Sequence, residues 1–153
     1  MNQLFPYIPT KTDYPEIITL WEKSVVATHH FLTKRDIKAY KNLILNQFLD
    51  QVDLYCYRNE FKILGFIGLN QDMIQMLFIH PDARNKGIGK QLLLFAIEQK
   101  RCTKVHVNEQ NEQAKGFYKH FGFQIMERFD HDSAGKPYPI LAMELNPASY
   151  INA

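Results

Sequence analysis

The N-terminal third of the chain repeats its apolar residues with the period of an α-helix. Asp13 is predicted to cap the start of one helix, whose apolar face follows. That face consists of Tyr14, Ile17, Ile18, Trp21 and Val25. Thr33 and Asp36 form the capping pattern of a second helix. Residues 4–8 are predicted as a preceding strand, at a sheet edge because Pro6 and Pro9 cannot donate to a β-ladder.

Between residues 53 and 79 the pattern changes to the short apolar runs of β-strands. Residues 53–58 and 61–69 are separated by Asn59 and Glu60, and this spacing predicts a hairpin. Residues 73–79 are almost continuously apolar, as expected for a central strand covered on both faces.

The C-terminal half alternates helices and strands. A helix is predicted from Gly87, a strand at 104–108, a helix at 111–122 and strands at 123–129 and 140–145. This order predicts an α/β fold: a mixed, twisted sheet of about seven strands flanked by about four helices. The chain has no repeat or linker, so residues 1–146 are predicted as one domain and 147–153 as a short tail.

Composition narrows the class of protein. The 153 residues suit one domain, and the net charge of +2 is too small to indicate nucleic-acid binding. The N-terminus lacks a signal-peptide pattern and the chain lacks a membrane-spanning apolar run. Cys56 and Cys102 have no metal-ligand spacing and suit a reduced interior. We therefore expect a soluble, cytoplasmic protein without a metal, either a monomer or a homodimer.

The segment RNKGIG, residues 84–89, lies between a buried strand and the start of a helix. The first turn of a helix carries unpaired N–H groups and partial positive charge, and Gly87 and Gly89 allow a phosphate to approach the backbone. Arg84 and Lys86 add charge beside it. The pattern is not a P-loop, and a dinucleotide motif would have a third glycine. By itself the segment could also be a plain glycine-containing turn.

The motif R-x-x-G-x-G between a strand and a helix resembles the acetyl-coenzyme A loop of the GNAT superfamily, the Gcn5-related N-acetyltransferases. Arg84, Gly87 and Gly89 match that pattern. The resemblance implies that backbone N–H groups of the loop hold the coenzyme A pyrophosphate, in the segment Asn85, Lys86, Gly87, Ile88, Gly89 and Lys90. It also implies that Leu77, Phe78 and Ile79 of the preceding strand pair with the pantetheine arm.

A second segment, NEQAKGFYKHFGF, agrees with this resemblance. Asn111, Ala114 and Tyr118 share one helical face, and Gly122-Phe123 leads into a strand. By resemblance, Asn111 contacts the pantetheine arm, Ala114 also belongs to the coenzyme site, and Tyr118 lies beside the sulfur and protonates the departing thiolate. A phenol, with a pKa near 10, is suited to this role. The alternative is that Tyr118 is an aromatic residue packed against the sheet. SVVATHHFL, this segment and GKPYPIL also resemble small bacterial acetyltransferases of the YjaB type.

The resemblance implies an N-acetyltransferase that uses acetyl-CoA as donor and an amine as acceptor. The acceptor can be a small molecule, a protein lysine or a protein N-terminus, attacking directly in a ternary complex. A backbone N–H of the central strand is expected to polarise the thioester carbonyl. The alternative is a non-catalytic acyl-CoA-binding or sensing module with the same fold.

The base that deprotonates the amine is not evident. Many GNAT enzymes carry a glutamate on or beside the central strand, but MIQMLFI contains no acid. His29 is the preferred candidate because of its ordinary pKa near 6.5, and His30, Asp72, Glu109 and water remain alternatives. His29, Phe31 and Tyr138 are predicted to line the acceptor site, although 135–139 could equally be a turn before an edge strand.

Overall fold

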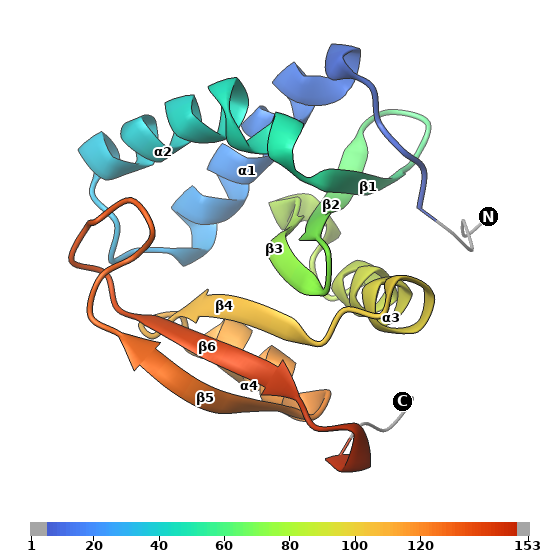
Figure 1. Cartoon of the computed structure of the whole chain (residues 1–153). Helices are drawn as coiled ribbons and strands as arrows, with labels where there is room; N and C mark the ends of the chain where they lie inside the picture. Colours follow the sequence, from blue (N-terminus) through green and yellow to red (C-terminus); the bar gives the residue numbers. More distant parts are fainter. Residues whose placement is uncertain (1–5, 150–153) are drawn as a thin grey trace.

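The computed structural model describes residues 6–149, arranged as an α/β sheet with helices on both faces (Figure 1). The helices are α1 (Tyr14–Thr28), α2 (Lys34–Asn46), α3 (Ile88–Lys100) and α4 (Glu112–His120). The strands are β1 (Asp53–Arg58), β2 (Ile63–Asn70), β3 (Met73–Ile79), β4 (Lys104–Asn108), β5 (Phe123–Phe129) and β6 (Ile140–Leu145). None of the helices in this part of the chain is long and apolar enough to span a membrane.

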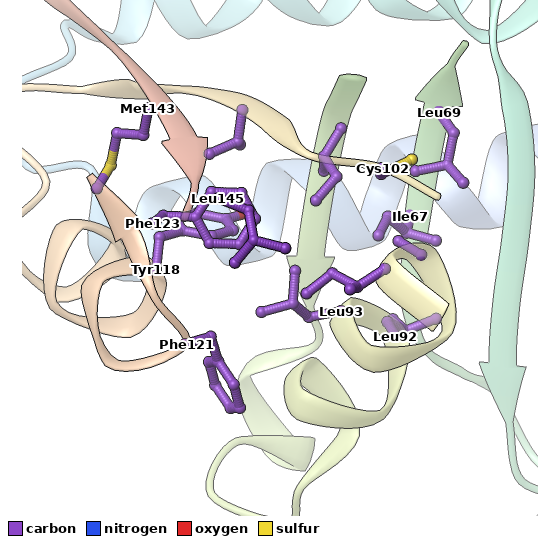
Figure 2. Packing of buried hydrophobic residues seen from close by; sticks show 14 of the residues in the cluster. Ile67, Leu69, Leu92, Leu93, Cys102, Tyr118, Phe121, Phe123, Met143 and Leu145 are labelled. Atoms are coloured by element: carbon purple, nitrogen blue, oxygen red, sulfur yellow. The ribbon is translucent and has the colours of Figure 1, made fainter. Parts of the chain in front are cut away.

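The six strands form one sheet in the order β1-β2-β3-β4-β6-β5. Only β3 and β4 run parallel among the described strand pairs. Apolar residues of α1 and α2 pack against β1–β3 on one face. Residues of α3 and α4 form the core of the opposite face, where Tyr118, Phe121, Phe123 and Leu145 gather beside Leu92 and Leu93 (Figure 2).

Strand β3 contains a β-bulge opposite β2. In β3, Ile74 pairs with Leu69 and Met76 with Gly68, so Gln75 is one extra residue without a partner on β2. A bulge bends the strand that carries it. Accordingly, the described pairs of β3 with β4 are confined to Met73–Lys104 and Ile74–Val105, and the strands part beyond this point. The bend opens the cleft described below.

The helices, the mixed sheet and the order of the elements confirm the predicted architecture. The prediction of about seven strands was slightly too high. In the described part of the predicted strand 4–8, Tyr7 forms one antiparallel bridge with Cys56, because the flanking Pro6 and Pro9 offer no N–H to extend it. Residues 4 and 5 lie outside the described part. The division into a domain 1–146 and a tail stays a prediction.

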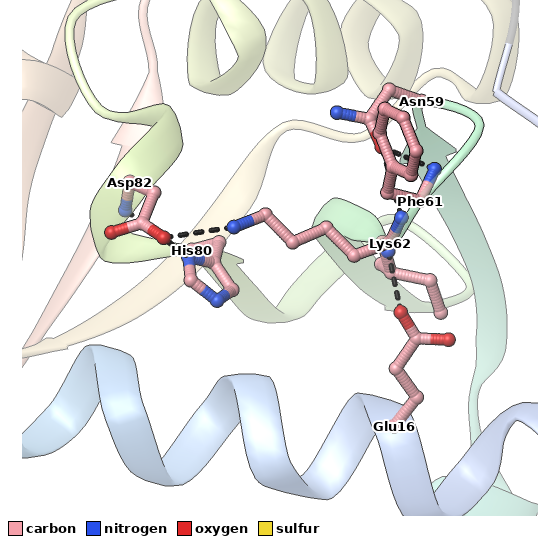
Figure 3. A network of polar contacts seen from close by, with 7 residues as sticks. Glu16, Asn59, Phe61, Lys62, His80 and Asp82 are labelled. Atoms are coloured by element: carbon pink, nitrogen blue, oxygen red, sulfur yellow. Dashed lines mark hydrogen bonds and ion pairs between the residues drawn. The ribbon is translucent and has the colours of Figure 1, made fainter.

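Two local predictions need correction. The β1–β2 connection is longer than Asn59-Glu60, because the Asn59 side chain accepts hydrogen bonds from the N–H groups of Phe61 and Lys62 (2.8 and 2.9 Å) and β2 begins only at Ile63 (Figure 3). Asp13 precedes α1, but its carboxylate accepts from the N–H of Thr10 (2.9 Å) and so stabilises the preceding 3-10 turn instead.

Candidate active site

A cleft of about 380 Å³ opens where β3 and β4 part. Its walls come from β3, the loop before α3, the first turn of α3, β4, α4 and the end of α1. Of the predicted coenzyme-binding residues, it is lined by Leu77, Phe78, Ile79, Arg84, Asn85, Gly87, Ile88, Gly89, Lys90, Asn111, Ala114 and Tyr118. Lys86 is exposed and outside this lining. The fold therefore brings both motifs and His29 to one cavity.

The edge of β3 that faces the cleft offers backbone hydrogen-bonding groups. The His80 N–H donates to the Leu64 carbonyl on β2 (2.7 Å). Since successive residues of a strand direct their backbone groups to opposite sides, Leu77 and Ile79 direct theirs away from β2. On that side the described pairing with β4 has already ended. This edge can therefore pair with an extended, amide-containing ligand.

The start of α3 has the features of an anion site. Gly87, the N-cap, has φ +80°, a left-handed conformation that favours glycine, and no side chain caps the first turn. The first turn of an α-helix leaves its N–H groups without intrahelical partners, here those of Ile88, Gly89 and Lys90. This turn also carries no acidic residue. The donors and the helix dipole therefore suit a pyrophosphate.

The segment that leads into this loop is anchored to the β1–β2 hairpin. The His80 Nδ1 accepts a hydrogen bond from the Asp82 N–H (3.1 Å), and the Lys62 ammonium pairs with the Asp82 carboxylate (2.8 Å) (Figure 3). Burial lowers the pKa of His80, so its imidazole is neutral and its Nδ1 can accept. These contacts hold the exit of β3 in place before the chain turns into α3.

Arg84 connects the loop to the opposite wall of the cleft. Its guanidinium donates to the side-chain oxygen of Gln113 on α4 (2.6 Å). Lys90 also lines the cleft, whereas the ammonium of Lys115 is paired with Glu112 (2.7 Å). Arg84 and Lys90 thus supply the positive charge on the lining itself.

Asn111 is held at the start of α4 by its own capping bond. Its Oδ1 accepts from the Ala114 N–H (3.1 Å), which directs the Nδ2 group the other way. The Nδ2 lies 3.4 Å from the Nε2 of His29. The predicted coenzyme side and acceptor side of the site therefore meet at this pair.

Tyr118 sits at the base of the cleft with 5% of its surface exposed. Its ring packs edge-on against Phe117, with a centroid distance of 5.2 Å. It packs in the same way against Phe123, with a centroid distance of 5.5 Å (Figure 2). Burial raises the pKa of the phenol, so it remains protonated at neutral pH and can serve as a proton donor. The sequence-based alternative, a packed aromatic residue, describes the same side chain: Tyr118 is both buried and part of the cleft.

His29 ends α1 beside the cleft, with its ring 6.3 Å from Phe78 and 5.4 Å from Phe31. Burial, with a smaller contribution from His30, lowers the pKa of His29 to about 4. The imidazole is therefore neutral at pH 7 and can accept a hydrogen bond. Because its pKa is low, the His29 imidazole is a weak base and is poorly suited to take a proton from an alkylammonium group.

Phe31 and Tyr138 continue the aromatic surface outside the cleft lining. Their ring centroids lie 5.9 Å apart, so Phe78, His29, Phe31 and Tyr138 form a continuous row. The Tyr138 hydroxyl donates to Asp36 at the start of α2 (2.5 Å). The structure thus brings together all three predicted acceptor-site residues.

The other predicted bases are placed less favourably. Asp72 lies before β3, at the end where β3 and β4 pair, and its carboxylate is 3.4 Å from the Lys104 ammonium. Glu109 accepts from the Arg128 guanidinium (2.6 Å), which lowers the pKa of the carboxyl and weakens it as a base. Neither lines the cleft.

Sequence reasoning missed six polar residues of the lining: Ser24, Thr28, Gln75, His106, Asn108 and Gln113. Ser24 and Thr28 follow Trp21 at helical spacing on the buried face of α1, and polar residues on an apolar face are the signal that could have revealed them. His106 is an exposed position of β4 between two buried valines, a pattern common to half-buried strands. Within residues 6–149, no cluster of three or more His, Cys, Asp or Glu side chains is placed to hold a metal ion.

One cleft thus brings together the parted strands β3 and β4, a helix start with a glycine N-cap and no side-chain cap, and a buried tyrosine. Comparison with known proteins gives the class of protein to which this site belongs. A family model described as "Acetyltransferase (GNAT) domain" matches residues 50–125. The chain belongs to the GNAT family of acetyltransferases, and it is an acetyl-CoA-dependent N-acetyltransferase.

The similar proteins include the peptidyl-lysine N-acetyltransferases YjaB of Salmonella typhimurium and Escherichia coli. Each is 39% identical over 127 residues, which span 82% of this chain and 87% and 86% of theirs. The solution structure of apo-form YjaB from Escherichia coli superposes with a TM-score of 0.82 at 35% identity, covering 95% of this chain and 96% of that one. The PaiA N-acetyltransferase of Thermoplasma acidophilum in complex with coenzyme A shares the fold (TM-score 0.71, 19% identity, covering 90% and 96%).

Proposed function

We propose that this enzyme acetylates the ε-amino group of lysine residues in proteins. The observation that carries the proposal is the aromatic row Phe78, His29, Phe31 and Tyr138, which leads to the cleft and contains a neutral imidazole. The four-carbon stem of lysine can pack against such rings while its terminal nitrogen reaches His29. The YjaB relatives, which are named peptidyl-lysine N-acetyltransferases, support this choice of acceptor.

The proposed donor site follows from the lining of the cleft. The N–H groups at the start of α3, with Arg84 and Lys90, hold the pyrophosphate of coenzyme A, and the free edge at Leu77 and Ile79 pairs with its pantetheine arm. The bound coenzyme supplies an acetyl thioester. A backbone N–H of β3 then polarises the thioester carbonyl.

Two proposed residue roles complete the transfer. His29 Nε2 accepts a hydrogen bond from the neutral amine and orients its lone pair for direct attack on the carbonyl carbon. The C–N bond forms and the C–S bond breaks. Tyr118 donates its proton to the departing sulfur, and the proton released by the amine returns to the phenolate through solvent, so the protons balance. No acetyl-enzyme forms. Buried Cys56 and Cys102, whose thiol pKa values burial raises, are unsuited as nucleophiles.

A peptide assay tests the acceptor. An N-terminally blocked peptide with one lysine, the same peptide with arginine in its place, a lysine-free peptide with a free N-terminus and a polyamine are each incubated with enzyme and acetyl-CoA. We expect thiol release and an acetyl mass increment on the lysine peptide. Acetylation confined to the free N-terminus or the polyamine would overturn the proposed acceptor. A cytoplasmic location, where donor and protein acceptor would meet, is part of the proposal.

A further inference from the structure

We propose that Thr28 is a positioning residue: its hydroxyl fixes the tautomer of His29 with the proton on Nδ1 and the lone pair of Nε2 facing the cleft. The tautomer follows from hydrogen bonds of the protein alone. Its catalytic consequence rests on the proposed function, in which Nε2 receives the amine.

The first step concerns the single hydroxyl proton of Thr28. The Thr28 Oγ1 lies 2.8 Å from the Ser24 carbonyl oxygen, one helical turn earlier, and a carbonyl can only accept. The hydroxyl must therefore donate to Ser24, since otherwise two acceptors would face each other at that distance. The same Oγ1 lies 2.7 Å from His29 Nδ1. With its proton already committed, the hydroxyl oxygen accepts there, and Nδ1 is the donor.

The second step comes from the other side of the imidazole. The capping bond from the Ala114 N–H identifies the Asn111 oxygen, so the group that faces His29 is the Nδ2 amide, which can only donate. Nε2 must therefore carry the lone pair. The contacts from α1 and α4 define the same tautomer independently.

The surroundings favour this arrangement over a charged ring. The Phe31 and Phe78 rings flank His29, and Ser24 is 8% exposed, so little water reaches Thr28's side of the ring. A hydroxyl beside Nδ1 orients the ring as a carboxylate would, but without a negative charge that would favour the imidazolium. Asn111 at 3.4 Å is a long hydrogen bond, which an incoming amine can replace at Nε2.

Nuclear magnetic resonance of the whole protein tests the tautomer directly. Two-bond ¹H–¹⁵N correlation spectra of the imidazoles distinguish a protonated ring nitrogen from one that bears a lone pair. In the free wild-type protein we expect His29 to be protonated at Nδ1 only. Thr28→Val keeps the β-branched shape and removes the acceptor, so only the long 3.4 Å contact with Asn111 still favours this tautomer, and we expect a tautomer mixture. Thr28→Ser is expected to restore the wild-type pattern. Protonation at Nε2 in the wild type would overturn the proposal even if Thr28→Val does not fold.

Measurements of kcat distinguish a positioning role of Thr28 from a role in packing alone. We expect Thr28→Val to lower kcat for the lysine peptide about 10-fold with unchanged acetyl-CoA affinity, and Thr28→Ser to restore most of it. Thr19→Val is the matched control, because the exposed Thr19 makes the same bond one turn back, to Pro15, on the same helix. An altered tautomer with an unchanged kcat would refute the positioning role. If no lysine peptide is acetylated by the wild type, the proposed acceptor fails while the NMR result still decides the tautomer.

Discussion

The side-chain amide of Asn111, at the start of α4, lies 3.4 Å from the Nε2 of His29, at the end of α1. The two residues are 82 positions apart in the sequence and belong to helices on opposite faces of the sheet. They meet because β3 and β4 part beyond Ile74 and the cleft passes between the two faces. Under the proposed function, the contact would join the donor side to the acceptor side, with an amine at His29 adjacent to a donor at Asn111.

Tyr118→Phe is expected to retain acetyl-CoA binding and to lower kcat about 100-fold, since it removes the proposed proton donor and keeps the packed ring. Rates at saturating lysine peptide and calorimetric titration with acetyl-CoA measure the two effects. Tyr55→Phe, on β1 against Phe95, serves as control and should leave kcat unchanged. A wild-type rate in Tyr118→Phe would remove the phenol from the mechanism.

Gly87→Glu is expected to weaken acetyl-CoA binding by at least about 100-fold, because a carboxylate would repel the pyrophosphate at the start of α3. A residue here must also adopt φ +80°, which costs roughly 1–2 kcal/mol for most side chains. Gly87→Asn is the matched control: asparagine tolerates this conformation, adds no charge, and a Cβ at this position meets nothing within 4 Å. Calorimetry that finds equal affinities for the two variants would contradict the assignment of the anion site.

His29 should make stability fall as the pH is lowered from 6.5 towards 4. The folded-state pKa of about 4 lies below the ordinary 6.5, so in this window the unfolded chain takes up a proton that the folded protein does not. The free energy of unfolding should therefore decrease by up to roughly 3 kcal/mol from this residue. Urea unfolding at pH 7 and pH 4.5 should show a smaller loss in His29→Gln than in the wild type. His30→Gln, at the exposed neighbour, should behave as the wild type; the same loss in all three would rule out His29 as the source.

Gly65 and Gly116 should respond in opposite directions to a larger side chain. At Gly65 on β2, a Cβ would lie 2.8 Å from Ile79 Cδ1 and 3.0 Å from Ile88 Cγ2. Gly65→Val should therefore destabilise the protein by about 1–3 kcal/mol and displace the start of α3, which weakens acetyl-CoA binding. At Gly116 in α4 there is open space, and Gly116→Ala should stabilise by about 0.5–1 kcal/mol with binding unchanged. Thermal unfolding and calorimetry check both, and normal acetyl-CoA affinity in Gly65→Val would disprove the coupling.

Local patterns were sufficient to predict most of the fold. Thr33 caps α2 through the Asp36 N–H, Asn111 caps α4, and Gly87 begins α3, and each signal depends on residues within one turn. In the described part of residues 4–8, pairing with β1 is limited to Tyr7, in line with the edge position that Pro6 and Pro9 indicated. The connection of the β1–β2 hairpin was predicted too short, because the hydrogen bonds of the Asn59 side chain stabilise a longer turn than the residue spacing indicates.

The site was only partly accessible from sequence. The coenzyme motifs are contiguous, so their residues could be recognised by spacing and resemblance. The bulge at Gln75 depends on pairing with Gly68 and Leu69 and leaves no mark in MIQMLFI itself. Likewise, the neutral state of His29 depends on its burial, and Phe78 of β3 and Asn111 of α4, which lie beside its ring, are far from it in the sequence. Long-range packing of this kind cannot be read from the neighbours of a residue along the chain.

The short junction between β3 and β4 also has a consequence for the lifetime of the enzyme. In the described strands, only two residue pairs join β3 to β4 and so connect the two halves of the sheet. A donor that lies along the unpaired edge of β3 would add backbone hydrogen bonds beyond those pairs. A ligand that binds only the folded state adds about 2.7 kcal/mol of stability at a concentration 100 times its Kd. Resistance to proteolysis should therefore rise and fall with the acetyl-CoA supply, so that starvation reduces the amount of intact enzyme as well as its saturation.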